Sequence, residues 1–280
     1  MGSGSLACVG VGMMLGAHLT PRARAEIEQA EVVFALVSDP LVELWLRELR
    51  PDLHSLQPLY GSGDADGKPR DASYRDMVEA MLAPVRAGRR VCGAFYGHPG
   101  VFAVVPHRAI ARARAEGHPA RMEPGVSAED CLYADLGIDP GTHGCQHYDA
   151  SQFLWYRHRL DPAAYLVLWQ VGVAGDSTLR RFSVDAGHIA LLADRLGRDY
   201  PLDHGVTAYE AATLPVASPR IEHMPLRAMG EATWRLQTTL VVPPAVRREV
   251  DMEMRRRLDG AQGIEHRNGP QRAQLEGEER

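Results

Sequence analysis

Residues 6–12 read LACVGVG, an apolar run that ends in two glycines. A short apolar run bounded by glycine is typical of a buried strand. Thr20 and Pro21 follow and predict the start of a helix, because threonine is a good N-cap and proline is favoured at the first helical position. This segment therefore predicts a strand, a glycine-bearing loop and a helix, which is the first unit of an α/β fold.

The same alternation of short apolar runs and amphipathic segments continues to residue 242. Further strands are predicted at residues 31–37, 90–95, 165–170, 205–209 and 234–242. Two helices are predicted to start at Asp39 and at Ser127. Three more are predicted around Met77 to Val85, at 106–116 and at 178–196. Ser127 and Asp130 have the spacing of a capping box, which marks a helix start. The alternation predicts the α/β class with mostly parallel sheets.

A chain of 280 residues is long enough for two ordinary domains. We place a boundary at the run PGVSAED of residues 124–130. The predicted organisation is an N-terminal α/β domain at 1–123, a C-terminal α/β domain at 124–245, and a charged, helical to disordered tail at 246–280.

Composition excludes several functional classes. The formal net charge is −5 and no long basic stripe is present, which argues against a nucleic-acid-binding protein. No apolar run reaches the length of a membrane span, so we expect no membrane partner and a cytoplasmic location. The four cysteines form no C-x-x-C pair and the histidines show no ligand spacing, so we expect buried thiols and no metal site.

The glycine loop resembles a dinucleotide-binding fingerprint only superficially. Gly10, Gly12 and Gly16 have G-x-G-x-x-x-G spacing, and the predicted helix starts eight residues beyond Gly12. A pyrophosphate needs the N–H groups of a helix that begins directly after the glycines. The loop therefore disfavours NAD(P) binding, and it leaves a structural turn and a loop that shapes another cofactor pocket as alternatives.

Longer motifs carry a resemblance to a known family. The glycine loop, the run YGHPGVF at 96–102 and the run PGVSA at 124–128 resemble the tetrapyrrole (precorrin-like) methylases over residues 5–245. More narrowly, three runs are similar to the borosin peptide backbone N-methyltransferases: DGKPR at 66–70 with Tyr74, the run at 96–102, and PGVSAED at 124–130 continuing to ADL at 134–136 and HGC at 143–145.

The resemblance implies two αβα domains with S-adenosylmethionine in the cleft between them, a homodimer, and a ribosomal precursor peptide that is methylated on backbone nitrogens. The cofactor contacts that it implies fall on Gly10, Gly12, Tyr96, His98, Val101, Phe102, Ser127, Ala128, Gln170, Val171 and Gly172. The catalytic residues that it implies are Tyr60, Arg70 and Tyr74. The loop between Tyr60 and Arg70 is a few residues longer than the family's usual spacing. The longer loop affects the assignment of Tyr60 as a catalytic residue, and not the assignments of Arg70 and Tyr74.

The chemistry needs such residue types. The lone pair of an amide nitrogen is delocalised into the carbonyl, so the nitrogen must lose its proton before it attacks a sulfonium methyl. Arg70 offers a permanent charge for the negative carbonyl oxygen, and a tyrosine can act as base if a guanidinium favours its phenolate. Arg70 and Tyr74 are four residues apart and share one face if a helix starts by Asp71.

Other interpretations stay open at this point. The tyrosines and Arg70 could be surface residues of a glycine-rich loop, Tyr96 and Phe102 could be core aromatics, and His98 could be a turn residue with a locally satisfied ring. Rival functions are a corrin or sirohaem C-methyltransferase and a catalytically silent peptide-binding homologue. Residues 243–280 contain no apolar segment like a methylated core, so we expect the precursor to be a separate protein bound in trans.

Overall fold

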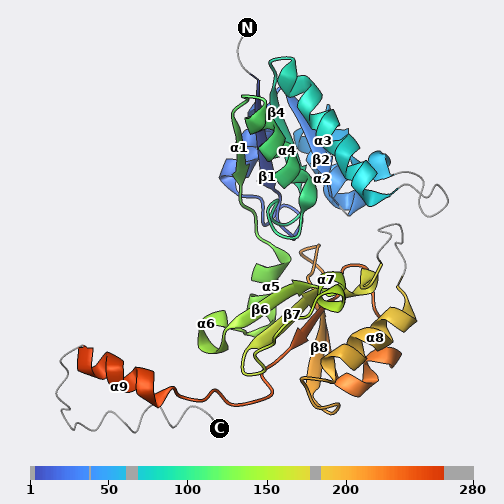
Figure 1. Cartoon of the computed structure of the whole chain (residues 1–280). Coiled ribbons are helices and arrows are strands. Elements are labelled where there is room, and N and C mark those ends of the chain that lie inside the picture. The colour runs from blue at the N-terminus through green and yellow to red at the C-terminus, as the bar shows by residue number, and fades with distance from the viewer. Residues whose placement is uncertain (1–3, 38, 61–68, 177–183, 262–280) are drawn as a thin grey trace. The chain divides into compact units, whose positions relative to one another are not determined.

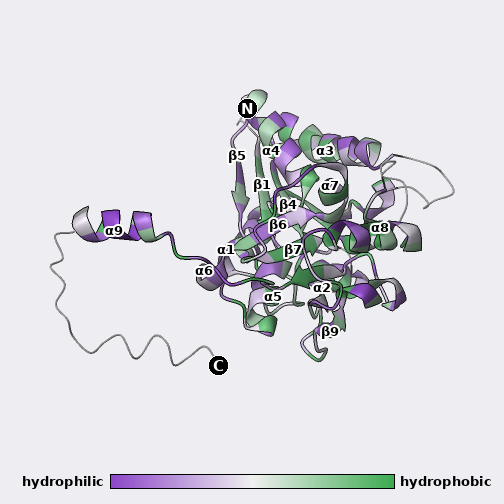
Figure 2. Cartoon of the chain, turned by 60° about the horizontal axis from the view of Figure 1, so that its bottom comes forward, coloured by the Kyte–Doolittle hydropathy of each residue, from purple (hydrophilic) through white to green (hydrophobic). Residues whose placement is uncertain are grey.

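The structure of the chain is a computed structural model that describes residues 4–37, 39–60, 69–176 and 184–261 (Figure 1). Residues 1–245 form one compact unit and residues 246–280 form a second. In the second unit, α9 (Met252–Ala261) is mainly hydrophilic (Figure 2), and its described residues are exposed almost throughout. No helix in the described part of the chain has the length and apolar composition to span a membrane.

The first sheet is parallel throughout. Its strand order is β3-β2-β4-β1-β5, with bounds β1 (Ser5–Gly10), β2 (Val32–Leu36), β3 (His54–Ser55), β4 (Arg90–Phe95) and β5 (Ala120–Glu123). A parallel sheet is normally covered on both faces, and this one is. The helices α1 (Pro21–Gln29) and α2 (Pro40–Leu49) pack on one face, and α3 (Arg70–Arg86) and α4 (Val104–Ala115) pack on the other.

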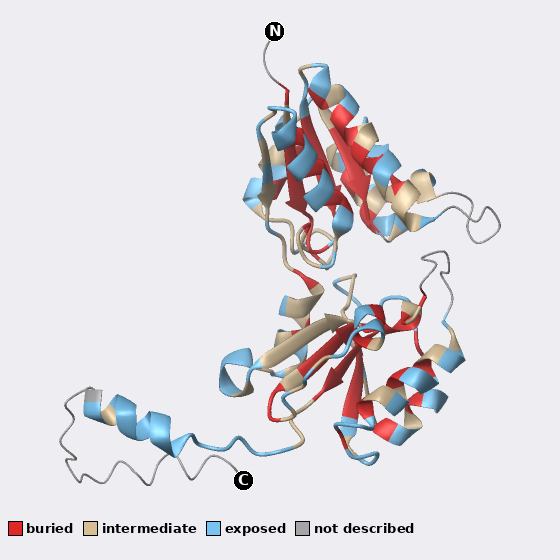
Figure 3. Cartoon of the chain, viewed as in Figure 1, coloured by how far each residue is buried: buried red, intermediate tan, exposed pale blue. Residues whose placement is uncertain are grey.

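The alternation of side chains along β1 explains these two faces. Leu6 and Cys8 belong to the core under α3 and α4, whereas Ala7 and Val9 belong to the core under α1 and α2. Successive strand residues point to opposite faces, so a strand buried on both sides is apolar at every position. The buried colour along the central strands of both sheets follows this rule (Figure 3).

The second sheet is mixed. Its order is β6-β7-β10-β8-β9, with bounds β6 (Cys145–Asp149), β7 (Tyr165–Trp169), β8 (Gly205–Glu210), β9 (Arg220–Pro225) and β10 (Thr239–Val242). Within the described residues of this second sheet, only the β6–β7 pair is parallel, and the other three strand pairs are antiparallel. Core contacts place α5 (Ala128–Leu136) on one face, and α7 (Ala150–Trp155) with α8 (Ala186–Leu196) on the other. The short helices are α6 (Pro140–His143), η1 (Gln57–Tyr60), η2 (Val171–Val173) and η3 (Leu226–Glu231).

The predicted α/β class with three-layered αβα halves is confirmed. The helix starts at Thr20-Pro21 and Asp39-Pro40 are also confirmed: Thr20 accepts from the Ala23 N–H, and Asp39 accepts from the Leu41 N–H. Ser127 and Asp130 form the predicted capping box.

Three boundaries and one topology were wrong. The helix predicted at 178–196 begins at Ala186, with Asp185 as N-cap, and residues 177–183 lie outside the described part. The last strand starts at Thr239 rather than Trp234, and the tail helix starts at Met252 rather than 246. The predominantly parallel pairing holds only in the first sheet. In the second sheet β9 pairs antiparallel with β8, and β10 pairs antiparallel with both β7 and β8.

Three glycine backbones meet where β1 and β4 end. A Cβ on Gly10 would lie 2.4 Å from the Gly97 carbonyl oxygen and 2.7 Å from the Gly125 Cα, and a Cβ on Gly125 would lie 2.4 Å from that same oxygen. Real Cβ atoms do not approach backbone atoms so closely. Only glycine therefore allows the loops after β1, β4 and β5 to touch.

We expect Gly10→Ala to destabilise the fold by about 1–3 kcal/mol, because the methyl group must push a backbone carbonyl aside. The measurement is the thermal unfolding midpoint. Gly230→Ala is the matched control, since a Cβ there meets nothing within 4 Å. Equal midpoints for the two variants would contradict the proposed close approach.

Candidate functional site

The glycine loop is tied to the loop after β4. Gly12 and Gly97 pair through two backbone hydrogen bonds, from the Gly12 N–H to the Gly97 oxygen at 3.2 Å and from the Gly97 N–H to the Gly12 oxygen at 2.9 Å. Gly12 has φ +79°, and a Cβ there would lie 2.1 Å from the Cβ of His18. Ligands of parallel α/β sheets bind outside the carboxyl ends of the strands, and these loops lie there.

A cluster of three tyrosines and one arginine forms at the start of α3. Arg70 is the first residue of that helix, so Arg70 and Tyr74 share one face as predicted. The rings of Tyr60 and Tyr74 pack edge to face, with centroids 6.2 Å apart and an interplanar angle of 78°. Tyr74 also acts electrostatically on Tyr96, which follows β4. The three residues predicted to be catalytic thus lie together.

The electrostatics of Tyr60 correct one expectation. Burial, Tyr74 and Tyr96 raise the pKa of Tyr60, and the nearby charge of Arg70 lowers it by less than they raise it. A guanidinium therefore does not make Tyr60 a phenolate in this structure, because desolvation of the charged form outweighs the attraction. A hydrogen bond between the Tyr60 and Tyr74 side chains also raises the pKa of Tyr60.

Arg70 also acts on a carboxylate of the second sheet. Burial raises the pKa of Asp149, and hydrogen bonds from the Gln152 and Ser151 backbone together with the charge of Arg70 lower it in part. Asp149 ends β6 and caps α7, where it accepts from the Gln152 N–H at 2.9 Å. Arg70 thus has charged and phenolic neighbours from both sheets.

Two residues with strained backbones lie at the predicted cofactor positions. Phe102 has φ +48° and Gln170 has φ +58°, and they are the only non-glycine residues with positive φ in the described part of the chain. Such strain in a non-glycine residue persists only where the surroundings enforce it, and it clusters at functional sites. The Phe102 ring packs on Trp169, which directly precedes Gln170, with ring centroids 5.4 Å apart. The two strained residues therefore belong to one locality.

The turn after β7 rests on a buried polar network. The Val171 N–H donates to the Thr238 oxygen at 3.1 Å, and a Cβ on Gly172 would lie 2.2 Å from the Arg235 oxygen. The Thr238 hydroxyl donates to Glu210 at 2.6 Å. Burial would raise the pKa of Glu210, but hydrogen bonds from Thr238, Arg220 and Arg235 hold it below its usual value. The Gln170–Gly172 turn is thereby fixed to β8 and β10.

The remaining predicted residues have local partners. The Nδ1 of His98 accepts from the Gly100 N–H at 2.8 Å, and the Val101 N–H donates to the His98 oxygen, so both form the turn after β4. Ser127 is buried, and its N–H and hydroxyl both contact Asp130 at 2.7 Å. Ala128 opens α5 and packs in the same cluster as Trp169.

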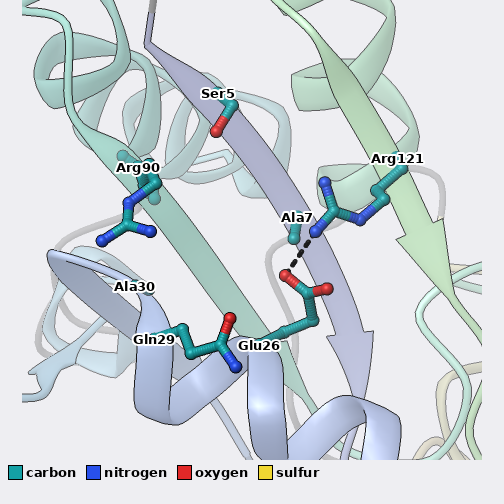
Figure 4. A pocket seen from close by; sticks show the side chains of 8 residues that line it. Ser5, Ala7, Glu26, Gln29, Ala30, Arg90 and Arg121 are labelled. Atoms are coloured by element: carbon teal, nitrogen blue, oxygen red, sulfur yellow. Dashed lines mark hydrogen bonds and ion pairs between the residues drawn. The ribbon is translucent and has the colours of Figure 1, made fainter.

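Two cavities differ in their position along the strands. One of about 230 Å³ is bounded by Met14, His18, Val126 and Asp130 among others, so it borders the glycine loop and the start of α5. The other, of about 160 Å³, is lined by Ser5, Ala7, Arg90 and the Glu26–Arg121 ion pair (Figure 4). The second cavity lies at the amino ends of β1 and β4, the edge where such sheets do not bind ligands. Within the described ranges, no three His, Cys, Asp or Glu residues are grouped to hold a metal ion.

Comparison of the sequence with known protein families identifies the family of this chain. Residues 5–229 match the family described as Tetrapyrrole (Corrin/Porphyrin) Methylases. The chain belongs to the tetrapyrrole methylase family. Solved structures with the same fold include a uroporphyrin-III C-methyltransferase from Thermus thermophilus, with a TM-score of 0.61, 23% identity, and coverage of 87% of this chain and 96% of that one.

Curated relatives that are similar in sequence have names that join a methyltransferase with a peptide precursor. A methyltransferase/ribosomally synthesized type I borosin cyclic peptide precursor of Coprinopsis marcescibilis is 45% identical over 79% of this chain and 56% of its own length. The gymnopeptide precursor of Gymnopus fusipes, named in the same way, is 39% identical over 92% of this chain and 61% of its own. The chain thus spans about three fifths of the length of these relatives.

Sequence reasoning missed several residues around this tetrapyrrole methylase site. Asp149, His147 and Glu210 were not singled out, and β5, β6 and β9 were not predicted. The Asp149-Ala150-Ser151 run could have indicated Asp149, because an aspartate before a short apolar helix is a common N-cap. Glu210 had no such local signal, since its partners are 10 to 28 residues away.

We expect Glu210→Gln to lower the free energy of unfolding by about 1–3 kcal/mol at neutral pH, because it weakens a buried charged network. The folded-state pKa of Glu210 is lowered, so this stabilisation is present above about pH 4.3, the ordinary glutamate value, and is lost as the pH falls through the folded-state pKa. Urea unfolding at pH 7 and in acid measures both effects. Glu222→Gln is the control, because Glu222 contacts the same Arg220 from an exposed position; a deficit for Glu210→Gln that persists in acid would refute the assignment.

Proposed function

We propose that this chain is an S-adenosylmethionine-dependent methyltransferase that methylates backbone amide nitrogens of a peptide. The observation that carries the proposal is the cluster of Arg70 with Tyr60, Tyr74 and Tyr96 beside the strained Phe102 loop. A permanent cation amid phenolic groups suits a reaction in which negative charge develops on an amide oxygen. The composite names of the relatives support a peptide as the substrate class.

The residues present fit S-adenosylmethionine. The close contact of Gly10, Gly97 and Gly125 brings the loops after β1, β4 and β5 together at the carboxyl ends of the strands, where ligands of such sheets bind. The residues that we propose to hold it are those of the glycine loop, the turn after β4, the start of α5 and the turn after β7: Gly10, Gly12, Tyr96, His98, Val101, Phe102, Ser127, Ala128, Gln170, Val171 and Gly172. When bound, the cofactor supplies an electrophilic methyl group on a positive sulfur.

The proposed roles follow from the hydrogen bond between the tyrosines. Tyr74 is the proposed base: it enters the reaction as a phenolate, which the Tyr60 hydroxyl is placed to stabilise, and it becomes a neutral phenol when it takes the amide proton. Arg70, one helical turn before Tyr74, donates to the amide oxygen as the nitrogen loses its proton. A bound cofactor would supply the methyl group to the deprotonated nitrogen, and the amide proton would remain on Tyr74.

We further propose that residues 1–123 and 124–245 act as two domains that share this site, in a homodimer, and that the peptide is a separate chain. Residues 243–280 include no apolar run that resembles a methylated core. The names of the curated relatives join methyltransferase and precursor in one chain, and this chain spans about three fifths of their length.

The experiment is incubation of the purified chain with S-adenosylmethionine and a synthetic apolar peptide, followed by mass spectrometry of both molecules. We expect additions of one methyl group at a time on the peptide, with fragmentation placing them on backbone nitrogens. Methyl groups on the chain itself would refute action in trans. Methylation of a uroporphyrinogen, with none on any peptide, would refute the peptide as substrate.

We expect Tyr74→Phe and Arg70→Gln to slow methylation on the order of a hundredfold or more, because each removes a group that handles the amide proton or its charge. S-adenosylhomocysteine binding, measured by calorimetry, should persist in both variants. Tyr165→Phe and Arg75→Gln are matched controls: Tyr165 packs on His143, and Arg75 lies on the same helix as Arg70 but pairs with Asp71 at the surface. Rates that fall equally in variants and controls would contradict these roles.

A further inference from the structure

A histidine in the second sheet links α5 to the aromatic ring that supports Phe102. His147 lies in the middle of β6, half-buried, between Trp169 of β7 and Tyr133 of α5. The indole N–H of Trp169 donates to the Nδ1 of His147 at 3.0 Å. On the other side of the ring, the Nε2 of His147 lies 2.9 Å from the Tyr133 hydroxyl.

These contacts fix the protonation of the ring. An indole N–H can only donate, so Nδ1 must be without a proton. The Tyr133 hydroxyl donates its single proton to Glu129 at 3.0 Å, so it accepts from His147. His147 is therefore neutral with its proton on Nε2, and the hydrogen bonds run in one direction from His147 through Tyr133 to Glu129.

The histidine also fixes the orientation of the indole. The His147 and Trp169 rings are nearly parallel, at 17°, with centroids 6.0 Å apart. Trp169 is 6% exposed, and its ring also packs on the Phe102 ring, with the centroids 5.4 Å apart. Rotation of the indole about its Cβ–Cγ bond would break the hydrogen bond to Nδ1 and remove the surface on which Phe102 rests. Phe102 and Gln170, on either side of this indole, are the residues whose backbones are strained.

We propose that His147 is a positioning residue for the cofactor loop: as a neutral acceptor it holds the Trp169 indole, and the indole holds Phe102 in its left-handed conformation. The inference rests on the proposed function, in which Phe102 contacts S-adenosylmethionine. His147 itself touches neither cofactor nor substrate. Nothing in the sequence singled it out, because its partners come from two other elements, β7 and α5.

The hydrogen bond between Trp169 and His147 depends on the charge state of His147. Protonation of Nδ1 would turn the acceptor into a donor facing the indole N–H, and the contact would open. Burial lowers the pKa of His147, and Glu129 raises it in part, so the neutral form prevails at neutral pH. The titratable groups in contact with this network are Glu129 and Tyr133 on α5 and Cys145 on β6, and the pKa of Cys145 is raised by burial.

The test compares His147→Phe, which keeps a ring but offers no acceptor, with His147→Asn, whose amide oxygen can take the place of Nδ1. We expect His147→Phe to weaken S-adenosylhomocysteine binding in calorimetry about tenfold, the effect of leaving one buried donor unpaired. His147→Asn should recover most of the affinity. His158→Phe is the matched control, because His158 is another half-buried histidine of this half, stacked on Phe153 and Tyr148.

A spectroscopic readout tests the contact without the cofactor. The fluorescence of Trp169, taken as the difference between the wild-type chain and Trp169→Phe, should change on acidification with a midpoint below the ordinary histidine value of about 6.5. The change should vanish in His147→Asn. A transition that survives in His147→Asn would overturn the proposed contact.

The outcomes separate this inference from the proposed function. Wild-type affinity in His147→Phe, or equal losses in His147→Phe and His158→Phe, would overturn the positioning role while the proposed function stands. Failure of the wild-type chain to bind S-adenosylhomocysteine would overturn the proposed function, and the assignment of His147 to a cofactor loop would fall with it.

Discussion

The contact of the Gly10, Gly97 and Gly125 backbones is the constraint on which the rest of the site depends. A Cβ on Gly10 or on Gly125 would lie 2.4 Å from the Gly97 carbonyl oxygen and 2.7 Å from the Cα of the other glycine. The loops after β1, β4 and β5 thus come together with almost no side-chain volume between them. Because β1 is central among these strands, its glycine loop fixes where the Tyr96 turn and the start of α5 can lie.

Local sequence signals correctly predicted those helix starts and strands that depend only on neighbouring residues in the chain. Thr20-Pro21, Asp39-Pro40 and Ser127 with Asp130 each satisfy free N–H groups of the helix that follows, and each marked a helix start correctly. The strands β1, β4 and β8 are buried on both faces, so their apolar runs were visible without knowledge of their neighbours. β9 alternates exposed and half-buried residues at a sheet edge and gave no such run.

Long-range properties could not be predicted in the same way. The grouping of Tyr60 with Tyr74 requires η1 and α3 to pack together, and only the resemblance to a family anticipated it. The pKa of Tyr60 could not be predicted, because sequence spacing shows the nearby cation but not the desolvation that outweighs it. His147 and Asp149 share β6 with half-buried positions throughout, a pattern too ambiguous to indicate a strand or a site.

The strained residues show how the two halves of the site are joined physically. A left-handed Phe102 or Gln170 is unfavourable in an isolated turn, so packing elsewhere must enforce both. Trp169 is placed to do so, since it contacts Phe102 by its ring and precedes Gln170 in the chain. Its own orientation depends on a neutral histidine acceptor, and that histidine depends on a tyrosine whose proton is already committed to Glu129. The turn that carries Phe102 is thus supported by a directional hydrogen-bond chain that runs from Trp169 through His147 and Tyr133 to Glu129, on the first turn of α5.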